Sequence, residues 1–292
     1  MGGKLMKHKR TDGTQIRDLD GFHSIVPYVM PKRTEAEVSS HELFDLTELV
    51  KYLHSRNETE GLNLKLFHAV CTSIARTIWH RPKMNIFIAG KRFWQRNMIL
   101  LSFVVKRKFE DSSEESLMCL KVDPDMNLDS ISHMILGDVE KVRKENTNDL
   151  GKTMDFVGKL PRPILTILFG FLHIFEYFGV MPVSLMKGDP NYSTVLLSNL
   201  GSIGAGAPYH HLSNYGTCSV MVTIGTLHPE KRTMEDGTEQ EREMLDITFT
   251  LDERIADGFY FAKSLKLTRW LLEHPEHLSE KISDPVPTEI FA

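Results

Sequence analysis

The segment 245–251, LDITFTL, alternates strictly between apolar and polar residues. Successive side chains of a β-strand point to opposite faces, so this alternation predicts a strand with one buried face and one polar face. A strand of this kind folds stably only where another hydrophobic layer covers its apolar face. The rest of the chain must therefore supply that layer.

Helices with an apolar stripe are the candidates for the covering layer. In 63–79 the stripe comprises Leu64, Phe67, Cys71, Ile74, Ala75 and Ile78, and the helix is expected to stop at Arg81–Pro82. A second helix, capped by Asp129, would carry Ile131, Met134, Ile135, Val139 and Val142 on one face. A last helix starts at Gly258, buries Phe261, Leu265 and Leu272, and ends before Pro275.

Further strands are expected at 85–90, 97–108, 116–122, 193–201 and 219–225. Strands mixed with amphipathic helices predict an α/β two-layer sandwich, in which helices cover a mixed β-sheet. The charged stretch 228–244 is expected to be a solvated hairpin loop with its turn at EDG, residues 235–237.

The chain has 292 residues and no internal repeat or Pro- or Ser-rich linker. We therefore expect a basic N-terminal tail over 1–20 and a single domain over 21–292. A net charge of −4 gives no reason to expect a nucleic-acid partner. The three cysteines lie far apart without a CxxC pair, which argues against a disulfide framework or a thiolate metal site. No signal peptide is visible in the first twenty residues, so a cytoplasmic location is expected.

An apolar segment at 161–182 needs a separate explanation. Its uncharged run between Arg162 and Glu176 has 13 residues, whereas the hydrocarbon core of a membrane needs about 20. We therefore expect no membrane span. The segment is predicted to be a buried helix, or a helix that lines an apolar pocket or a subunit contact.

Two stretches carry side chains that suit catalysis. Ser198 and Asn199 end a predicted strand, where a hydroxyl and an amide can stabilise a developing oxyanion. Gly201 follows in a glycine-rich turn without the helix that a dinucleotide-binding fingerprint requires. Further on, His210 and His211 are adjacent, so at most one of them is expected to face a given site as a base. No further ligands accompany the pair, and no metal site is expected.

The motifs LSNLGSIG, VTIG, DERIADG and LLEHPEHL follow one another along the chain. In this order they resemble the catalytic domain of the dihydrolipoamide acyltransferases of 2-oxo acid dehydrogenase complexes. That family shares its fold with chloramphenicol acetyltransferase. The resemblance is strongest over 193–278, and it continues more weakly in the opening segment 24–53, which looks like the domain's first strand and helix.

The resemblance implies a homotrimer with active sites between subunits, and coenzyme A or acyl-CoA as a substrate. In the family's last motif, Asp-His-Arg followed two residues later by Asp-Gly, the histidine takes a proton from the attacking thiol. Asp252, Arg254, Asp257 and Gly258 match that motif, whereas Glu253 stands in place of the histidine. Ser198 falls on the position of the family's oxyanion donor. Candidate substrate-binding residues are Asn199, Gly201 and Arg254. Asp257 matches an aspartate that has a structural role in the family. No lipoyl or subunit-binding domain precedes this region, so no lipoyl group is expected on the chain.

Glutamate is a weaker base than histidine for this task. Reference pKa values are about 8.5 for a thiol, 6.5 for histidine and 4.3 for glutamate. The replacement therefore costs about 3 kcal/mol in the proton transfer, or roughly a hundredfold in rate. Burial against Phe259, Tyr260 or a neighbouring subunit would recover much of this loss.

Three interpretations remain open at this point. The chain is an active acyltransferase that uses Glu253, or His210 or His211 in its place. Alternatively it is a catalytically silent paralogue that keeps the trimeric fold for binding or assembly, or it binds acyl-CoA and signals or stores it. The helix at 164–178 would line either the acyl pocket or the trimer axis.

Overall fold

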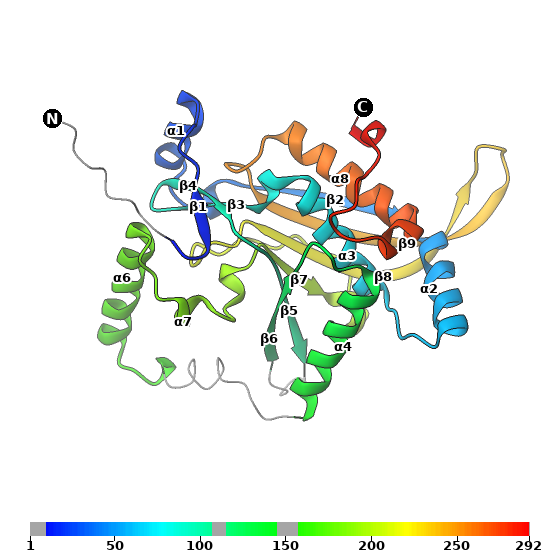
Figure 1. Cartoon of the computed structure of the whole chain (residues 1–292), viewed down its shortest axis with the longest axis horizontal. Coiled ribbons are helices and arrows are strands. Elements are labelled where there is room, and N and C mark those ends of the chain that lie inside the picture. Colours follow the sequence, from blue (N-terminus) through cyan, green and yellow to red (C-terminus); the bar gives the residue numbers. More distant parts are fainter. Residues whose placement is uncertain (1–9, 107–114, 145–156, 292) are drawn as a thin grey trace.

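A six-stranded mixed sheet with strand order β2-β9-β8-β7-β5-β6 forms the framework of the protein. The computed structural model in Figure 1 describes residues 10–106, 115–144 and 157–291. The strands are β2 (Glu37–Asp45), β5 (Ile99–Lys106), β6 (Glu115–Val122), β7 (Val195–Asn199), β8 (Val220–Thr233) and β9 (Glu239–Asp252). β7 pairs in parallel with both β5 and β8, and the remaining pairs are antiparallel.

Four helices pack on one face of this sheet and enclose the main core (Figure 1). They are α2 (Thr47–Glu60), α3 (Leu66–His80), α4 (Leu128–Lys144) and α8 (Gly258–Glu273). The apolar positions of the alternating segment are all buried in that core: Leu245, Ile247, Phe249 and Leu251. The polar positions of β9 therefore lie on the opposite face of the sheet, which these helices do not cover.

A smaller three-stranded sheet packs beside the main one, with order β1-β4-β3. It consists of β1 (Gly13–Gln15), β3 (Ile86–Ala89) and β4 (Arg92–Arg96). The described residues also form the helices α1 (Gly21–Val29), α6 (Arg162–Phe178) and α7 (Val183–Met186).

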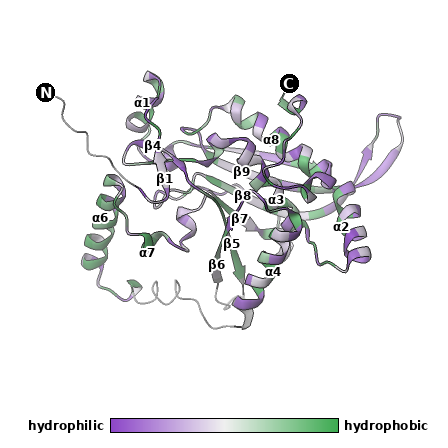
Figure 2. Ribbon diagram, in the orientation of Figure 1, coloured by the Kyte–Doolittle hydropathy of each residue, from purple (hydrophilic) through white to green (hydrophobic). Residues whose placement is uncertain are grey.

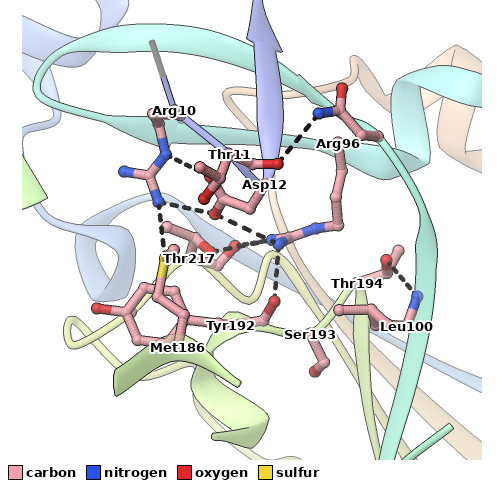
Figure 3. Close-up of polar contacts among 12 residues, drawn as sticks. Arg10, Thr11, Asp12, Arg96, Leu100, Met186, Tyr192, Ser193, Thr194 and Thr217 are labelled. Atoms are coloured by element: carbon pink, nitrogen blue, oxygen red, sulfur yellow. Dashed lines mark hydrogen bonds and ion pairs between the residues drawn. The ribbon is translucent and has the colours of Figure 1, made fainter. Parts of the chain in front are cut away.

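The start of the chain departs from the expected tail. Arg10 is buried, and β1 pairs with β4, so residues 10–15 belong to the fold. Arg10 donates to both carboxylate oxygens of Asp12 at 2.7 and 2.8 Å, and the buried Arg96 donates to the Tyr192 carbonyl at 2.7 Å (Figure 3). Burial lowers the pKa of Arg96 to about 10. The basic residues of this segment predicted a solvated tail, but the ion pairs of Arg10 hold the segment in the fold instead.

The expected solvated loop at 228–244 is mostly strand. β8 continues to Thr233 and β9 begins at Glu239, which leaves a turn of five residues. Gly237 adopts a left-handed φ of 79° at this turn, where the sequence placed it. The loop prediction was wrong because both faces of the hairpin are solvated, so its sequence lacks the apolar alternation that marks a half-buried strand.

The cap of α4 also differs from expectation. Asn127 rather than Asp129 accepts the hydrogen bond from the Ser130 backbone N–H, at 3.1 Å. Asp129 lies in the first turn and pairs with Arg56 across the surface at 3.0 Å. Both residue types favour a helix start, and the sequence pattern did not decide between positions two residues apart.

The helix predicted in the apolar segment forms as α6, but no residue of it is buried. Figure 2 shows it as a strongly hydrophobic helix at the edge of the molecule, away from the four covering helices. The prediction of a buried helix was therefore wrong within one chain. α6 does line two cavities, as the alternative interpretation expected. In the described part of the chain, no helix is long and apolar enough to cross a membrane.

Candidate active site

Ser198 lies at the end of β7, in register with Thr223 on β8 and, through it, with Thr248 on β9. Val195 and Leu197 point into the core, so Ser198 points to the opposite, helix-free face of the sheet. Its side chain is half-buried. A hydroxyl in this position is fixed by the strand yet remains within reach of a ligand.

The turn after β7 brings two backbones unusually close together. A Cβ atom added at Gly201 would lie 2.0 Å from the Gly225 carbonyl oxygen on β8. Gly204 ends the following 3₁₀ turn with a left-handed φ of 75°. Close packing therefore explains Gly201, and the left-handed backbone explains Gly204. Asn199, the other predicted binding residue here, lines a cavity of about 650 Å³ on the helical side of the sheet.

The turn after β9 is held by a buried carboxylate between two arginines. Asp252 is 0% exposed and accepts from Arg254 at 2.7 and 2.6 Å. Arg33 approaches the same carboxylate at 3.7 Å. Arg254 also donates to the Met30 carbonyl oxygen at 2.7 Å. With these contacts the Arg254 guanidinium fixes the turn, and only 4% of the residue is exposed for a contact with a substrate.

Asp257 closes the turn by capping α8. Its carboxylate accepts a hydrogen bond from the Tyr260 backbone N–H at 2.7 Å. This contact satisfies one of the free N–H groups at the helix start and agrees with the structural role that the resemblance implies for Asp257. The turn is thus fixed at both ends.

Glu253 occupies the exposed position between these anchors. Its backbone N–H donates to the Ala36 carbonyl oxygen at 2.8 Å, while its carboxylate forms no hydrogen bond or ion pair with the described residues. Phe259, against which the sequence analysis expected Glu253 to be buried, is itself 72% exposed. The Glu253 side chain therefore projects from a rigid turn at the surface of the chain.

His210 and His211 lie on an exposed segment near the same end of the sheet. Each ring Nδ1 contacts the carbonyl oxygen of the following residue, at 2.9 and 3.1 Å. The next N–H, of Leu212, donates to Glu37 at 2.9 Å. Glu37 follows Ala36, which accepts the Glu253 N–H, so the segment after the histidines and the Glu253 turn are bonded to adjacent residues.

One chain does not bring Ser198 and Glu253 together. Ser198 is level with Thr248, four residues before Asp252 on β9. This places Asp252 about 13 Å from Ser198 along the strands and about 10 Å across two strand spacings, and Glu253 follows Asp252 in the turn beyond β9. A base and an oxyanion donor that serve one thioester must each lie about 3 Å from it. The two residues therefore form two half-sites.

Sequence reasoning missed Arg33 and Glu37, which connect the half-site around Glu253 to the start of the chain. Both lie in the opening segment that matched the family only weakly, and neither stands in a recognisable motif. Across the described residues, no group of three or more histidine, cysteine or acidic side chains is arranged to hold a metal ion.

Comparisons with known proteins agree with the motifs. Residues 184–279 match the family model of the 2-oxoacid dehydrogenases acyltransferase catalytic domain. The lipoamide acyltransferase component of the branched-chain alpha-keto acid dehydrogenase complex of Bacillus subtilis is 23% identical over 235 residues. The match covers 78% of this chain and 45% of that protein, so the chain spans less than half the length of this relative.

Solved structures share the fold at low sequence identity. A probable dihydrolipoamide acetyltransferase from Listeria monocytogenes has a TM-score of 0.59 and 16% identity, covering 89% of this chain and 95% of that one. The cubic core of a pyruvate dehydrogenase multienzyme complex gives 0.59 and 15%, covering 90% and 94%. A chloramphenicol acetyltransferase gives 0.56 and 11%, covering 89% and 99%.

The predicted resemblance and the predicted two-layer fold are confirmed by these matches. Residues 184–279 are thus similar to the catalytic domain of the 2-oxoacid dehydrogenases acyltransferase family, and the fold is shared over most of the chain.

Proposed function

We propose that this protein is an acyl-CoA-dependent acyltransferase in which Glu253 is the base and Ser198 of a neighbouring copy is the oxyanion donor. The observation that carries the proposal is the rigid turn that presents Glu253. Burying Asp252 with Arg33 and Arg254 removes three charged groups from water, at a cost repaid only by good pairing. Such a turn fixes the backbone from which the Glu253 side chain projects.

The reaction follows from these two groups. The Glu253 carboxylate accepts the proton of an acceptor thiol, amine or hydroxyl as that atom attacks the carbonyl carbon of the acyl thioester. The oxyanion that forms accepts a hydrogen bond from the Ser198 hydroxyl. When the tetrahedral intermediate collapses, the carbon–sulfur bond breaks and the coenzyme A thiolate leaves. That thiolate recovers the proton from Glu253.

The proposal requires an assembly such as a homotrimer, because only a neighbouring copy can unite the two half-sites. Ser198 and Glu253 are separated by more than a substrate thioester can bridge within one chain, and a ring of identical subunits places one edge of each copy against a different edge of the next. Light scattering on the purified protein measures this directly. A monomer in solution would contradict the proposed site.

A specific observation favours the alternative of a silent paralogue. The Glu253 carboxylate is exposed and forms no hydrogen bond with the described residues, whereas a working base is usually oriented by a further group. In this alternative the fold would bind acyl-CoA or support assembly without turnover.

The experiment measures thiol release from a panel of acyl-CoA esters, with dihydrolipoamide, small amines and alcohols as acceptors. We expect Glu253→Ala and Ser198→Ala each to reduce turnover about 100-fold or more. His210→Ala and His211→Ala are the matched controls and should change turnover less than threefold. With a thiol acceptor, Glu253→His should raise the rate, by up to about a hundredfold.

Coenzyme A binding separates the two alternatives. Equilibrium dialysis with the natural protein and Glu253→Ala reports binding without turnover. If coenzyme A is retained and no acyl ester is cleaved across the panel, the chain is a binding protein and the catalytic proposal fails. If turnover collapses only in His211→Ala, the base is that histidine instead of Glu253.

A further inference from the structure

Two adjacent cavities flank α6; neither Ser198 nor Glu253 lines them, and the first reaches Arg33 and Arg254 behind the turn that carries Glu253. One has a volume of about 430 Å³ and the other about 490 Å³. They share four lining residues, His173, Glu176, Asn214 and Gly216, and so form one continuous groove. Each volume lies within the range of about 300–1,000 Å³ that is typical of small-molecule sites.

The first cavity is lined by cations. Lys32, Arg33, Lys91 and Arg254 all contribute to its wall, against the single carboxylate of Glu176. That carboxylate is already engaged, because it pairs with Arg10 and accepts from the Tyr192 hydroxyl at 3.1 Å. The end of the groove near α1 therefore favours a negatively charged group.

Arg33 is the strongest sign of a ligand in this cavity. It is 5% exposed, and its Nη1 and Nη2 donate to the carbonyl oxygens of Ser213 and Gly216, whereas its Nε has no hydrogen-bond partner among the described residues. The nearest carboxylate oxygen, on Asp252, is 3.7 Å away and already accepts a hydrogen bond from Arg254. Burial lowers the pKa of Arg33, as expected for a cation whose charge is incompletely compensated.

The second cavity has the opposite character. Its wall is formed by Phe169 and Leu172 of α6 and by Met181, Tyr192 and Tyr215. Phe169 and Tyr215 meet edge to face, with ring centroids 6.1 Å apart. The groove thus runs from a cationic end to an apolar and aromatic end along one helix.

From this arrangement we propose that the groove along α6 binds an amphiphile with an alkyl chain and an anionic head group, the head toward Arg33, Lys32 and Lys91 and the chain along the wall that Phe169 and Tyr215 form. A free fatty acid and an acyl-CoA share this chemistry. The site goes beyond the proposed transfer reaction, since neither Ser198 nor Glu253 lines it.

The experiment is a calorimetric titration of the full chain with dodecanoate, dodecanoyl-CoA and the uncharged detergent dodecyl maltoside. Dodecanoate has no thioester, so its binding does not depend on whether the chain is an acyltransferase. Cosedimentation with vesicles of dioleoylphosphatidylglycerol tests whether the protein binds a lipid surface. We expect dodecanoate or dodecanoyl-CoA to bind at least tenfold more tightly than the uncharged detergent, and the tighter of the two identifies the source of the ligand.

Two variants test the two ends of the groove. Lys32→Glu with Lys91→Glu should weaken binding at least tenfold by reversing charge at the head-group end, and Phe169→Asp should do so by placing a charge at the chain end. The matched controls lie outside both cavities. Lys51→Glu with Lys141→Glu makes the same charge change on exposed lysines, and Phe22→Asp changes a phenylalanine that is 74% exposed. Controls should stay within twofold of the natural protein.

Several results would overturn the proposal. These are the absence of binding by both anionic ligands, equal binding of dodecyl maltoside, binding to vesicles alone, or equal weakening in the control variants. Far-ultraviolet circular dichroism of every variant confirms that a loss of binding is not a loss of fold.

Discussion

His68 is a buried histidine that the fold holds in its neutral form. It is 2% exposed, and its Nδ1 accepts from the Lys65 backbone N–H at 3.2 Å and lies 2.7 Å from the Ser132 hydroxyl. Protonation of Nδ1 would break the Lys65 bond. Burial, reinforced by the charge of Lys65, lowers the pKa of His68 to about 4.

This pKa shift predicts a loss of stability in mild acid. Since the folded-state pKa is below the unfolded value of about 6.5, the unfolded chain binds the proton first, and the contribution to stability is lost as pH falls from about 6.5 to about 4. The loss from pH 7 to 4 is about 3 kcal/mol. Urea unfolding at both pH values measures it.

The matched variant is His68→Asn, whose side-chain oxygen can accept the same bonds without titrating. Its stability should fall less between pH 7 and 4, by about 2 to 3 kcal/mol. If the natural protein and the variant lose stability equally over this range, His68 is not the titrating group.

At the residue level, the sequence predicted what depends on near neighbours. Asp257 caps a helix three residues away, and Ser198 ends a strand, and both are visible in a short window. The partnership of Arg33 with Asp252 joins residues from opposite ends of the chain. No local pattern encodes this contact, because it depends on the pairing of β2 with β9.

At the level of elements, periodicity predicted strands and helices wherever one face is buried. β9 and α8 are confirmed because apolar residues mark the core-facing side of each. The same rule failed for the β8–β9 hairpin, whose two faces are polar, and for the burial of α6, whose apolar residues are exposed. An apolar stripe shows which face of a helix avoids water, but it does not show whether the same chain covers that face.

The contact between the glycine turn and β8 gives a prediction at this level. Gly201→Ala would place a Cβ atom 2.0 Å from the Gly225 carbonyl oxygen. Backbone must shift to relieve this overlap, so we expect a loss of roughly 2 kcal/mol or more in unfolding free energy. Thermal unfolding followed by circular dichroism measures the change.

Gly206→Ala is the control for this contact. An added Cβ there has no atom within 4 Å, and the change should alter the unfolding free energy by less than about 1 kcal/mol. Equal destabilisation by both substitutions would show that the turn, rather than the close approach to Gly225, sets the requirement for glycine.

At the level of the whole molecule, the resemblance implied active sites between subunits, and the structure adds the distance that separates Ser198 from Glu253 within one chain. The motif around Ser198 and the motif around Glu253 were each visible, but their separation depends on strand order and register. The proposed function requires that each active site combine Glu253 of one subunit with Ser198 of the next. This requirement can be tested with two inactive variants.

Co-expression of Ser198→Ala and Glu253→Ala chains should restore activity that neither variant has alone. In a ring of randomly mixed subunits, a site works when a chain with an intact Glu253 meets a neighbour with an intact Ser198. With equal amounts of both chains, this occurs at about one quarter of the sites. Acyl-CoA thiol release by the mixture should therefore approach about one quarter of the natural rate. The control pairs either variant with a chain that carries both substitutions, which leaves no complete site. A mixture no more active than that control would place both residues of each working site on a single chain.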